Sequence, residues 1–258
     1  MSIMTLAVLQ ARMSSSRLPG KVLADLVGAP MLLRQIERIL RCRAVDRLVV
    51  ATSTDPSDDT LVETVRRAGY EIARGSLDDV LDRFASVAKA ADPMHVVRLT
   101  GDCPLLDPLI VDAIIAQHLA TGADITTNAV SPTLPDGLDV EVMTAKALAE
   151  AADEALLAYE REHVTQFFYR RPERYRISHY RHSPDLSGMR WTVDNPEDLE
   201  FVREVYAALY PSRPDFGLAD VLALLAREPE LSSINHGFDR NEGLARSIAK
   251  EPAHGETR

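Results

Sequence analysis

Three short, mostly apolar runs constrain the fold of this chain more than any other feature. They cover residues 6–9, 48–52 and 95–99, and polar or turn-forming residues follow each of them directly. Between them, residues 30–41 and 57–68 space their apolar side chains as one face of a helix requires. Short buried strands that alternate with helices are typical of a parallel sheet. We therefore predict an α/β fold in which helices flank a mostly parallel sheet.

Further helices and strands are expected along the rest of the chain. Ser57 or Asp58 is expected to cap the second helix, and Gly69 to end it. Residues 132–143 begin as a turn and end with acidic and apolar residues alternating at period two, as in a half-exposed strand. The other expected strands lie at 70–73, 124–128, 174–182 and 190–193. Further helices are expected at 109–119, at 145–169 with a break near 158–160, and at 218–226, and two more are expected to begin near Ser76 and after Asp194.

The composition fits a globular protein of one domain. Of the 258 residues, 46% are hydrophobic and 26% are charged, which is ordinary for such a protein. The formal charge of −10 argues against bulk electrostatic attraction to nucleic acid or to an anionic membrane. We expect a single domain over residues 1–245, with an insertion at roughly 134–181, and a mobile tail at 246–258.

The cysteines and the apolar runs also bear on location. The two cysteines, Cys42 and Cys103, are too few for a disulfide scaffold or a zinc site. The apolar start is too short for a signal peptide, and no run reaches the length of a transmembrane helix. These features predict a cytoplasmic protein.

A cationic loop follows the first apolar run. It contains Arg12, three serines and Arg17, and then Pro19, Gly20 and Lys21. Backbone N–H groups, hydroxyls and fixed positive charges can converge on phosphate oxygens, so this loop suits a polyphosphate. No Gly-x-Gly-x-x-Gly follows the strand, and Gly-Lys is followed by Val where a Walker loop needs Ser or Thr. A solvated basic turn is the alternative interpretation.

Two aspartates stand at the ends of predicted strands. Asp102 follows the third apolar run and is expected at the same edge of the sheet as Arg12 and Lys21, because ligand groups gather at the carboxyl ends of parallel strands. A carboxylate beside a phosphate loop can hold Mg²⁺, but an aspartate in a Gly-Asp turn is common, and from these residues alone the turn is the favoured interpretation. Asp194 ends the predicted strand at 190–193 and can be an ordinary helix N-cap.

Several other polar residues each have two interpretations. Asp139 and Glu141 share one face of their predicted strand, where they can bind sugar hydroxyls or face water. His163 taken alone is more often a structural histidine than a catalyst. Arg74 taken alone is compatible with a surface charge beside a capping turn. Both interpretations of Asp139, Glu141 and His163 stay open at this point.

The motifs of this chain resemble those of a known family. The opening Ala-Arg, followed by Ser-Arg-Leu-Pro-Gly-Lys within residues 11–21, and Gly-Ala-Pro-Met at 28–31 are similar to the start of the sugar cytidylyltransferases. Gly-Asp-x-Pro-Leu from Gly101 and Asp-x-Pro-Glu-Asp-Leu from Asp194 resemble that family's metal-aspartate motifs. The family includes enzymes that activate 3-deoxy-octulosonate and nonulosonates. The resemblance is strongest to its SpsF-type branch and extends along nearly the whole chain.

This resemblance implies a fold, a nucleotide and a metal. The fold would be a Rossmann-like, nucleotide-diphospho-sugar transferase (GT-A-like) fold, with an inserted segment for dimerisation or sugar binding in a homodimer. CTP would bind at the loop and Mg²⁺ at Asp102 and Asp194. These two aspartates, Arg12 and Lys21 would be the catalytic residues. The implied nucleotide-binding residues are Leu9, Ala11, Arg12, Arg17, Gly20, Lys21, Arg74 and Thr100, and the implied sugar-binding residues are Asp136, Gly137, Asp139, Glu141 and His163.

The implied reaction is transfer of CMP from CTP to an acidic or related sugar, with release of pyrophosphate, for cell-surface polysaccharide or glycan biosynthesis. Arg12 and Lys21, with Arg17, would hold the β- and γ-phosphates. The resemblance also makes Arg74 a candidate for contact with the pyrimidine base. One departure concerns the base, because many members carry Gln where this chain has Thr100. The rival functions are a sugar-1-phosphate nucleotidyltransferase, a GT-A-type glycosyltransferase, whose Asp-x-Asp motif the chain lacks at the expected place, and a nucleotide-binding regulatory subunit.

Overall fold

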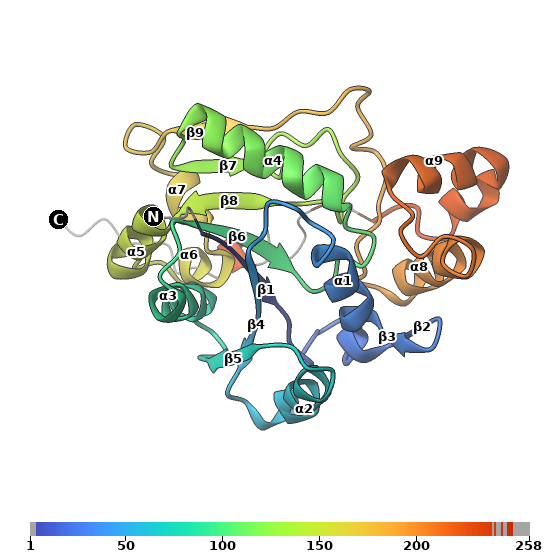
Figure 1. Cartoon of the computed structure of the whole chain (residues 1–258), viewed down its shortest axis with the longest axis horizontal. Helices are drawn as coiled ribbons and strands as arrows, with labels where there is room; N and C mark the ends of the chain where they lie inside the picture. Colours follow the sequence, from blue (N-terminus) through green and yellow to red (C-terminus); the bar gives the residue numbers. More distant parts are fainter. Residues whose placement is uncertain (1–3, 239, 241–243, 245–246, 250–258) are drawn as a thin grey trace.

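A mostly parallel sheet forms the centre of the fold in the computed structural model, which describes residues 4–238, 240, 244 and 247–249. Its strands within these residues are β1 (Thr5–Gln10), β4 (Arg47–Ser53), β5 (Ile72–Gly75), β6 (His95–Thr100), β7 (Ile125–Thr127), β8 (Glu141–Thr144) and β9 (Ile177–His179). Their order across the sheet is β5-β4-β1-β6-β8-β7-β9 (Figure 1). Only β8 runs antiparallel to its described neighbours, β6 and β7. The predicted fold class is confirmed.

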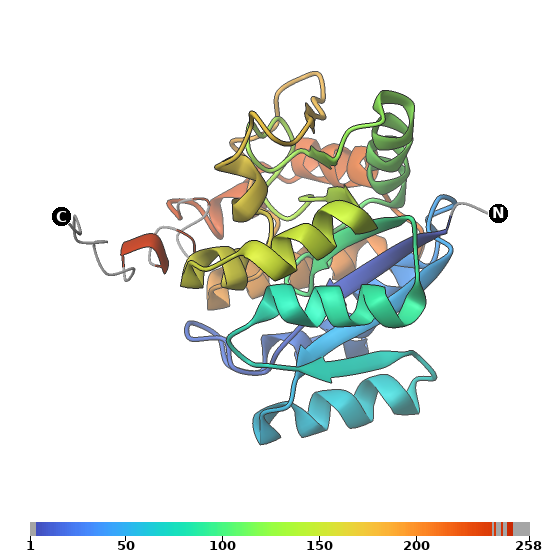
Figure 2. The same cartoon turned by 90° about the vertical axis from the view of Figure 1, so that its left-hand side faces the viewer.

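Helices cover both faces of this sheet. One face carries α1 (Met31–Ile39), α2 (Asp59–Arg67) and α4 (Pro108–Thr121), and beyond them α8 (Pro196–Leu209) and α9 (Leu218–Arg227). The other face carries α3 (Val80–Ala91) and α5 (Ala145–Glu154), which lie side by side in front of the strands in Figure 2. A short ribbon of β2 (Asp25–Leu26) and β3 (Ala29–Pro30) lies beside α1.

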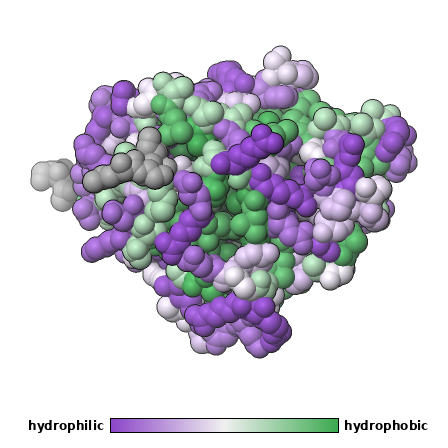
Figure 3. All heavy atoms as spheres, in the orientation of Figure 1, coloured by the Kyte–Doolittle hydropathy of each residue, from purple (hydrophilic) through white to green (hydrophobic). Residues whose placement is uncertain are grey.

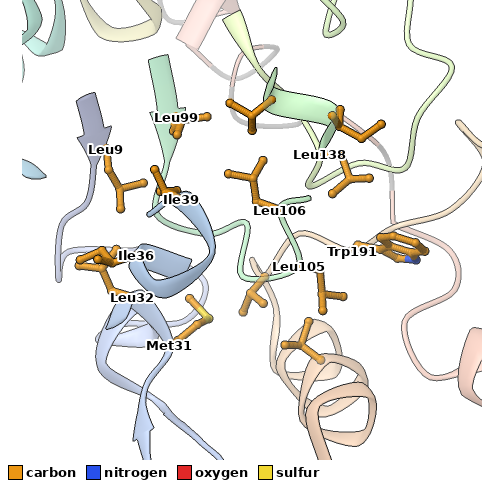
Figure 4. Close-up of a cluster of buried hydrophobic side chains, with 14 of the residues drawn as sticks. Leu9, Met31, Leu32, Ile36, Ile39, Leu99, Leu105, Leu106, Leu138 and Trp191 are labelled. Carbon is orange, nitrogen blue, oxygen red and sulfur yellow. The ribbon is translucent and has the colours of Figure 1, made fainter. Parts of the chain in front are cut away.

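The central strand β1 shows why both faces need cover. Leu6 and Val8 point into the cluster under α3 and α5, whereas Ala7 and Leu9 point into the cluster under α1. All four are fully buried, which is the pattern of a strand covered on both sides. Figure 4 shows Leu9 and Leu99 of the sheet facing the apolar side of α1. Burying a leucine or valine side chain in this way contributes about 1.5–3 kcal/mol to stability.

Two predicted helices differ in their ends. The long helical stretch divides into α5, α6 (Ala158–His163) and α7 (Gln166–Tyr169), so its first break lies before residue 158 rather than at 158–160. The helix expected to start near Ser76 starts instead at α3, where Asp79 accepts the N–H of Asp82 as the N-cap at 2.9 Å. The Ser76 hydroxyl accepts the N–H of Asp79 in the turn before it.

The strand predicted at residues 190–193 is wrong. Only Arg190 makes a strand-like pairing, a single bridge to Asp136, and the Val193 N–H donates to the carbonyl of Asp102 at 2.8 Å. Gly137 permits this close packing, because it has a φ of +106° and a Cβ there would lie 2.5 Å from the nitrogen of Thr192. The segment therefore passes beside the end of β6 without joining the sheet.

The predicted domain organisation is compatible with this structure but stays a prediction. Residues 134–181 include β8, which lies within the sheet between β6 and β7. Of the predicted tail at 246–258, only residues 247–249 lie within the described part.

No described helix is both long enough and apolar enough to span a membrane. Figure 3 shows hydrophilic residues over α2 and apolar ones nearer the centre of the same face.

A buried histidine pair predicts acid sensitivity of the fold. His118, only 1% exposed, lies with Nε2 3.0 Å from Nδ1 of His95 and with Nδ1 3.0 Å from the hydroxyl of Thr126. Burial, and then the charge of His95, lower the pKa of His118 to about 4. The unfolded chain, with a histidine pKa near 6.5, therefore binds the proton more tightly. Stability is present above about pH 6.5 and is lost as the pH falls toward 4.

We expect the free energy of unfolding to drop by on the order of 1–2 kcal/mol between about pH 7 and pH 5 through this pair. Urea denaturation at the two pH values measures it. In His118→Gln, whose amide can bond the same neighbours without titrating, the drop should shrink. An equal drop in the variant would rule out His118 as its cause.

Candidate functional site

Two adjoining cavities open at the carboxyl ends of β1 and β6, where ligands bind in parallel sheets. The first, of about 390 Å³, is lined by the loop after β1, by α3 and by the turn after β6. The second, of about 500 Å³, is lined by β8, by the segment after α6 and by the turn that contains Asp136. The residues that line both cavities are Gln10, Arg17, Arg98, Thr100, Asp102, His163 and Asp194.

The cationic loop is anchored by Asp58, which is fully buried. One carboxylate oxygen of Asp58 accepts the N–H of Met13 at 2.7 Å, and the other accepts from Thr52 at 2.9 Å and from Ser53. Burial alone would raise the pKa of Asp58, but these hydrogen bonds hold it below the ordinary value. Asp58 is the residue before α2, yet its side chain fixes the loop rather than capping that helix, contrary to our expectation.

Lys21 lies between two carboxylates. Gly20, with a φ of +75°, turns the chain into the short helix η1 (Lys21–Leu23) that carries this residue. The Nζ of Lys21 donates to the carbonyl of Val193 at 2.6 Å, to Asp194 Oδ1 at 2.9 Å and to Asp102 Oδ2 at 3.3 Å. Burial lowers the pKa of Lys21, but the charges of Asp102 and Asp194 outweigh it and raise the pKa. The site therefore holds a charged ammonium between the two carboxylates.

The two aspartates converge although they are far apart in the sequence. Burial alone would raise the pKa of Asp102, but the charge of Lys21 and hydrogen bonds from Thr100 and Cys103 hold it below its ordinary value. Asp194 is not a helix N-cap, because Asn195 occupies that position in α8. Asp198 accepts the N–H groups of Asn195 at 2.9 Å and Asp194 at 3.0 Å. The Asp194 carboxylate is thus left to face Lys21.

Arg190 ties this aspartate to the body of the protein. Its side chain, 9% exposed, donates to Asp198 Oδ1 at 2.9 Å, to Asp136 Oδ2 at 2.9 Å and to Asp194 Oδ2 at 3.1 Å. Burial works against its charge, but Asp198 and the other two carboxylates raise the pKa of Arg190. Arg17 pairs with the same oxygen of Asp194 at 2.9 Å. One cationic network therefore fixes the position of Asp194.

Most residues predicted for nucleotide binding lie at the first cavity. Leu9 does not, because its side chain is fully buried in the apolar core, and Gly20 only shapes the turn before Lys21. Arg74 lines neither of the two cavities; it donates to the carbonyl of Ser53 at 2.7 Å and pairs with Asp59 at 2.7 Å. The predicted residues that do line the first cavity are Ala11, Arg12, Arg17, Lys21, Thr100, Asp102 and Asp194.

The second cavity contains the predicted acidic residues. Asp136 and Asp139 line it together with Glu141, so the two residues expected on one strand face do share one cavity. Burial raises the pKa of Asp139 to about 7, against the charge of Arg240 beside it. Glu141 pairs with Arg98 at 2.5 Å and accepts the hydroxyl of Tyr169. These groups give the cavity many acceptors for ligand hydroxyls.

His163 and Gly137 have different positions. His163 lines both cavities, and its Nε2 lies 3.7 Å from Glu162. Burial, opposed by the charge of Glu162, lowers the pKa of His163, so the imidazole is neutral near pH 7. Gly137 lines neither of the two cavities and packs against the backbone of Trp191 and Thr192 instead.

The donor set fits a magnesium ion that arrives with phosphate. The described residues contain no cluster of three His, Cys, Asp or Glu placed to hold a metal on their own. Asp102 and Asp194 do approach one cation together, the ammonium of Lys21. Mg²⁺ is usually bound by one or two carboxylates with phosphate oxygens and water, which is what this pair can offer.

Several site residues are absent from the sequence predictions. Gln10, Arg83 and Arg98 line the first cavity, and Asp58 and Arg190 hold its walls in place. Arg98 lies on a predicted strand and Gln10 directly follows another, both at the predicted edge, so the sequence could have indicated their positions. Arg83 and Asp58 are buried and Arg190 is largely so, and the sequence surroundings of these three residues do not distinguish them from surface charges.

The fold and the site define a class: an α/β protein with cations and two convergent carboxylates at the carboxyl edge of its sheet. The family model described as Cytidylyltransferase matches residues 6–213. The chain is 36% identical to the Bacillus subtilis spore coat polysaccharide biosynthesis protein SpsF over 239 residues, which cover 88% of this chain and 96% of that protein.

Two further proteins agree with this assignment. A 3-deoxy-manno-octulosonate cytidylyltransferase of Anaeromyxobacter dehalogenans is 34% identical over 235 residues, or 90% of this chain and 85% of that protein. A solved cytidylyltransferase from Leptospira borgpetersenii has a TM-score of 0.87 at 28% identity and covers 93% of this chain and 100% of its own. The chain belongs to the cytidylyltransferase family and is a nucleotidyltransferase, which confirms the predicted family and enzyme class.

Proposed function

We propose that this enzyme transfers CMP from CTP to a hydroxyl of an acidic sugar, in a Mg²⁺-dependent reaction that releases pyrophosphate. The product would be an activated sugar for the synthesis of a cell-surface polysaccharide. The names of the relatives support this choice, because one is a spore coat polysaccharide biosynthesis protein and another is a 3-deoxy-manno-octulosonate cytidylyltransferase. The donor follows from the family, whose transferred group is cytidylyl.

The observation that carries the proposal is the position of Lys21. Its ammonium lies 2.9 Å from Asp194 and 3.3 Å from Asp102, at the wall of a cavity that Arg12 and Arg17 also line. Cations on one side suit a triphosphate, and two carboxylates beside them suit the metal that accompanies it. A regulatory nucleotide-binding subunit would not need a second, hydroxyl-binding cavity beside the phosphates.

The proposed chemistry relies on charge and positioning. The sugar oxygen attacks the α-phosphorus, the bond from that phosphorus to the bridging oxygen breaks, and pyrophosphate leaves as the hydroxyl proton is released. Arg12, Arg17 and Lys21 would bind the β- and γ-phosphates and stabilise the charge of the leaving group. Asp102 and Asp194 would hold Mg²⁺, which supplies charge neutralisation at the α-phosphate when bound.

The acceptor would occupy the second cavity, which adjoins the first at Asp102 and Asp194. Asp136, Asp139 and Glu141 can accept hydrogen bonds from sugar hydroxyls. Arg98, held at 2.5 Å by Glu141, is a cation of this cavity that could bind a sugar carboxylate. His163 lies at the junction of the two cavities, where it would contact the sugar.

An acceptor screen tests the proposal. Purified enzyme with CTP and Mg²⁺ is given 3-deoxy-octulosonate, nonulosonates, neutral hexoses and hexose 1-phosphates, and pyrophosphate release is measured. We expect release only with CTP, Mg²⁺ and an acidic sugar together. Release with a hexose 1-phosphate instead would favour a sugar-1-phosphate nucleotidyltransferase, and CTP binding without any release would favour the regulatory subunit.

A further inference from the structure

Arg83 is a buried arginine in the wall of the first cavity. It lies in the first turn of α3 and is only 4% exposed. Gly75 leaves room for it, because a Cβ at that glycine would lie 2.5 Å from Cγ of Arg83. The lack of a side chain at Gly75 therefore leaves space for the Arg83 side chain at the end of β5, beside the cavity.

No described residue accepts a hydrogen bond from this guanidinium, and its Nε and Nη1 are buried. The acids nearby have other partners: Asp58 binds the loop through Met13, and Asp79 binds Arg161. Burial, and then the charge of Arg12, lower the pKa of Arg83. Burying a guanidinium without acceptors is costly, so a ligand in the cavity is the group that can satisfy it.

An unpartnered acceptor lies in the wall of the same cavity. The side-chain oxygen of Gln10, at the end of β1, is buried and has no hydrogen-bond donor among the described residues. The two residues thus offer hydrogen-bond donors from Arg83 and one acceptor from Gln10. The hydrogen-bonding edge of cytosine offers the complement, since O2 and N3 are acceptors and the 4-amino group is a donor. Uracil carries N–H at position 3 and an oxygen at position 4, so it reverses two of these three groups.

Arg74, which the family resemblance makes a candidate for contact with the base, is bound away from both cavities by Ser53 and Asp59. Thr100 stands where many family members carry Gln, and its hydroxyl lies 3.3 Å from the sulfur of Cys103. Other side chains of the first cavity are therefore candidates for selecting the base.

We propose that Arg83 selects cytosine in the first cavity by donating hydrogen bonds to O2 and N3, while the Gln10 oxygen accepts one from the 4-amino group. This inference rests on the proposed use of CTP. With uracil, one N–H donor of Arg83 would face the N3–H donor of the base, and neither donor would have an acceptor. Leaving buried donors unpaired is costly, so the site would reject uracil strongly. Arg83 is a specificity-determining residue here, distinct from the phosphate-binding cations of the loop.

Calorimetric titration of CTP and UTP, each with Mg²⁺, tests this assignment. We expect the wild-type enzyme to bind CTP more tightly than UTP, and Arg83→Met to weaken CTP by about 10- to 100-fold while UTP changes by less than about threefold. Lys89→Met removes a cation from an exposed position of the same helix and should change neither. If Arg83→Met is unstable, Arg83→Lys and Gln10→Leu are each expected to reduce the preference for CTP.

Other outcomes overturn the assignment in distinguishable ways. Equal weakening of CTP and UTP in Arg83→Met would make Arg83 a phosphate ligand. An unchanged preference in Arg83→Met, or in both Arg83→Lys and Gln10→Leu, would remove these residues from base selection while leaving the proposed function intact. A wild-type enzyme that binds no CTP would overturn both.

Discussion

Replacing Asp102 by Asn is expected to lower the rate of pyrophosphate release by about 1,000-fold, and Asp194→Asn by a similar factor. Each change removes one of the two carboxylates that approach Lys21, at 3.3 Å and 2.9 Å, and with it half of the proposed metal ligands. Asn keeps the size of the side chain, and Lys21 keeps one charged partner. The fold should therefore survive, so the loss reports on the site.

Initial rates at saturating CTP, measured over a range of Mg²⁺ concentrations, give the result. Asp215→Asn, at an exposed position after α8, is the matched control and should retain the wild-type rate. Circular dichroism of all three variants excludes unfolding. Turnover within threefold of wild type in both site variants would mean that neither aspartate serves the reaction.

The second large effect concerns stability. Arg190→Met should lower the free energy of unfolding by about 3–5 kcal/mol, because removing one partner of a buried ion pair leaves the other charge uncompensated. Arg190 is bound to Asp136, Asp194 and the fully buried Asp198. Arg190→Lys should restore only part of the loss, since a point charge cannot replace a planar fork with three carboxylate partners.

Urea denaturation at about pH 7 measures these changes. The control is Arg213→Met, which breaks the exposed pair of Arg213 with Asp220 and should cost less than about 1 kcal/mol. If Arg190→Met were no more destabilising than Arg213→Met, the ion pairs of Arg190 would contribute little to stability, and Asp194 would be positioned by its backbone alone.

The sequence predicted the part of the fold that depends on local patterns. The apolar runs placed β1, β4 and β6 because strands buried on both faces are rich in apolar residues. The segment at 190–193 has the same local pattern, but it packs against Asp102 and Gly137 instead of a strand edge. Tertiary contacts decided that case, and local pattern cannot show them.

The site was predictable to the extent that motifs mark it. Family resemblance brought Asp102 and Asp194 together, and the structure places both beside Lys21. It also assigned Arg74 to the base, whereas that side chain is bound to Ser53 and Asp59, away from the cavities. The burial of Arg83 depends on a glycine on a neighbouring strand, which no spacing within α3 could indicate. Pairing of two copies through residues 134–181 stays a prediction.

The most direct test of the proposed reaction follows the phosphorus atoms of CTP. The enzyme is incubated with Mg²⁺ and an acidic sugar acceptor, using CTP labelled at the α-phosphate in one reaction and at the γ-phosphate in another. Transfer of CMP predicts the α-label in a nucleotide-linked sugar and the γ-label in pyrophosphate. Recovery of the γ-label on the sugar, or as inorganic phosphate without a nucleotide-linked product, would contradict the proposed function.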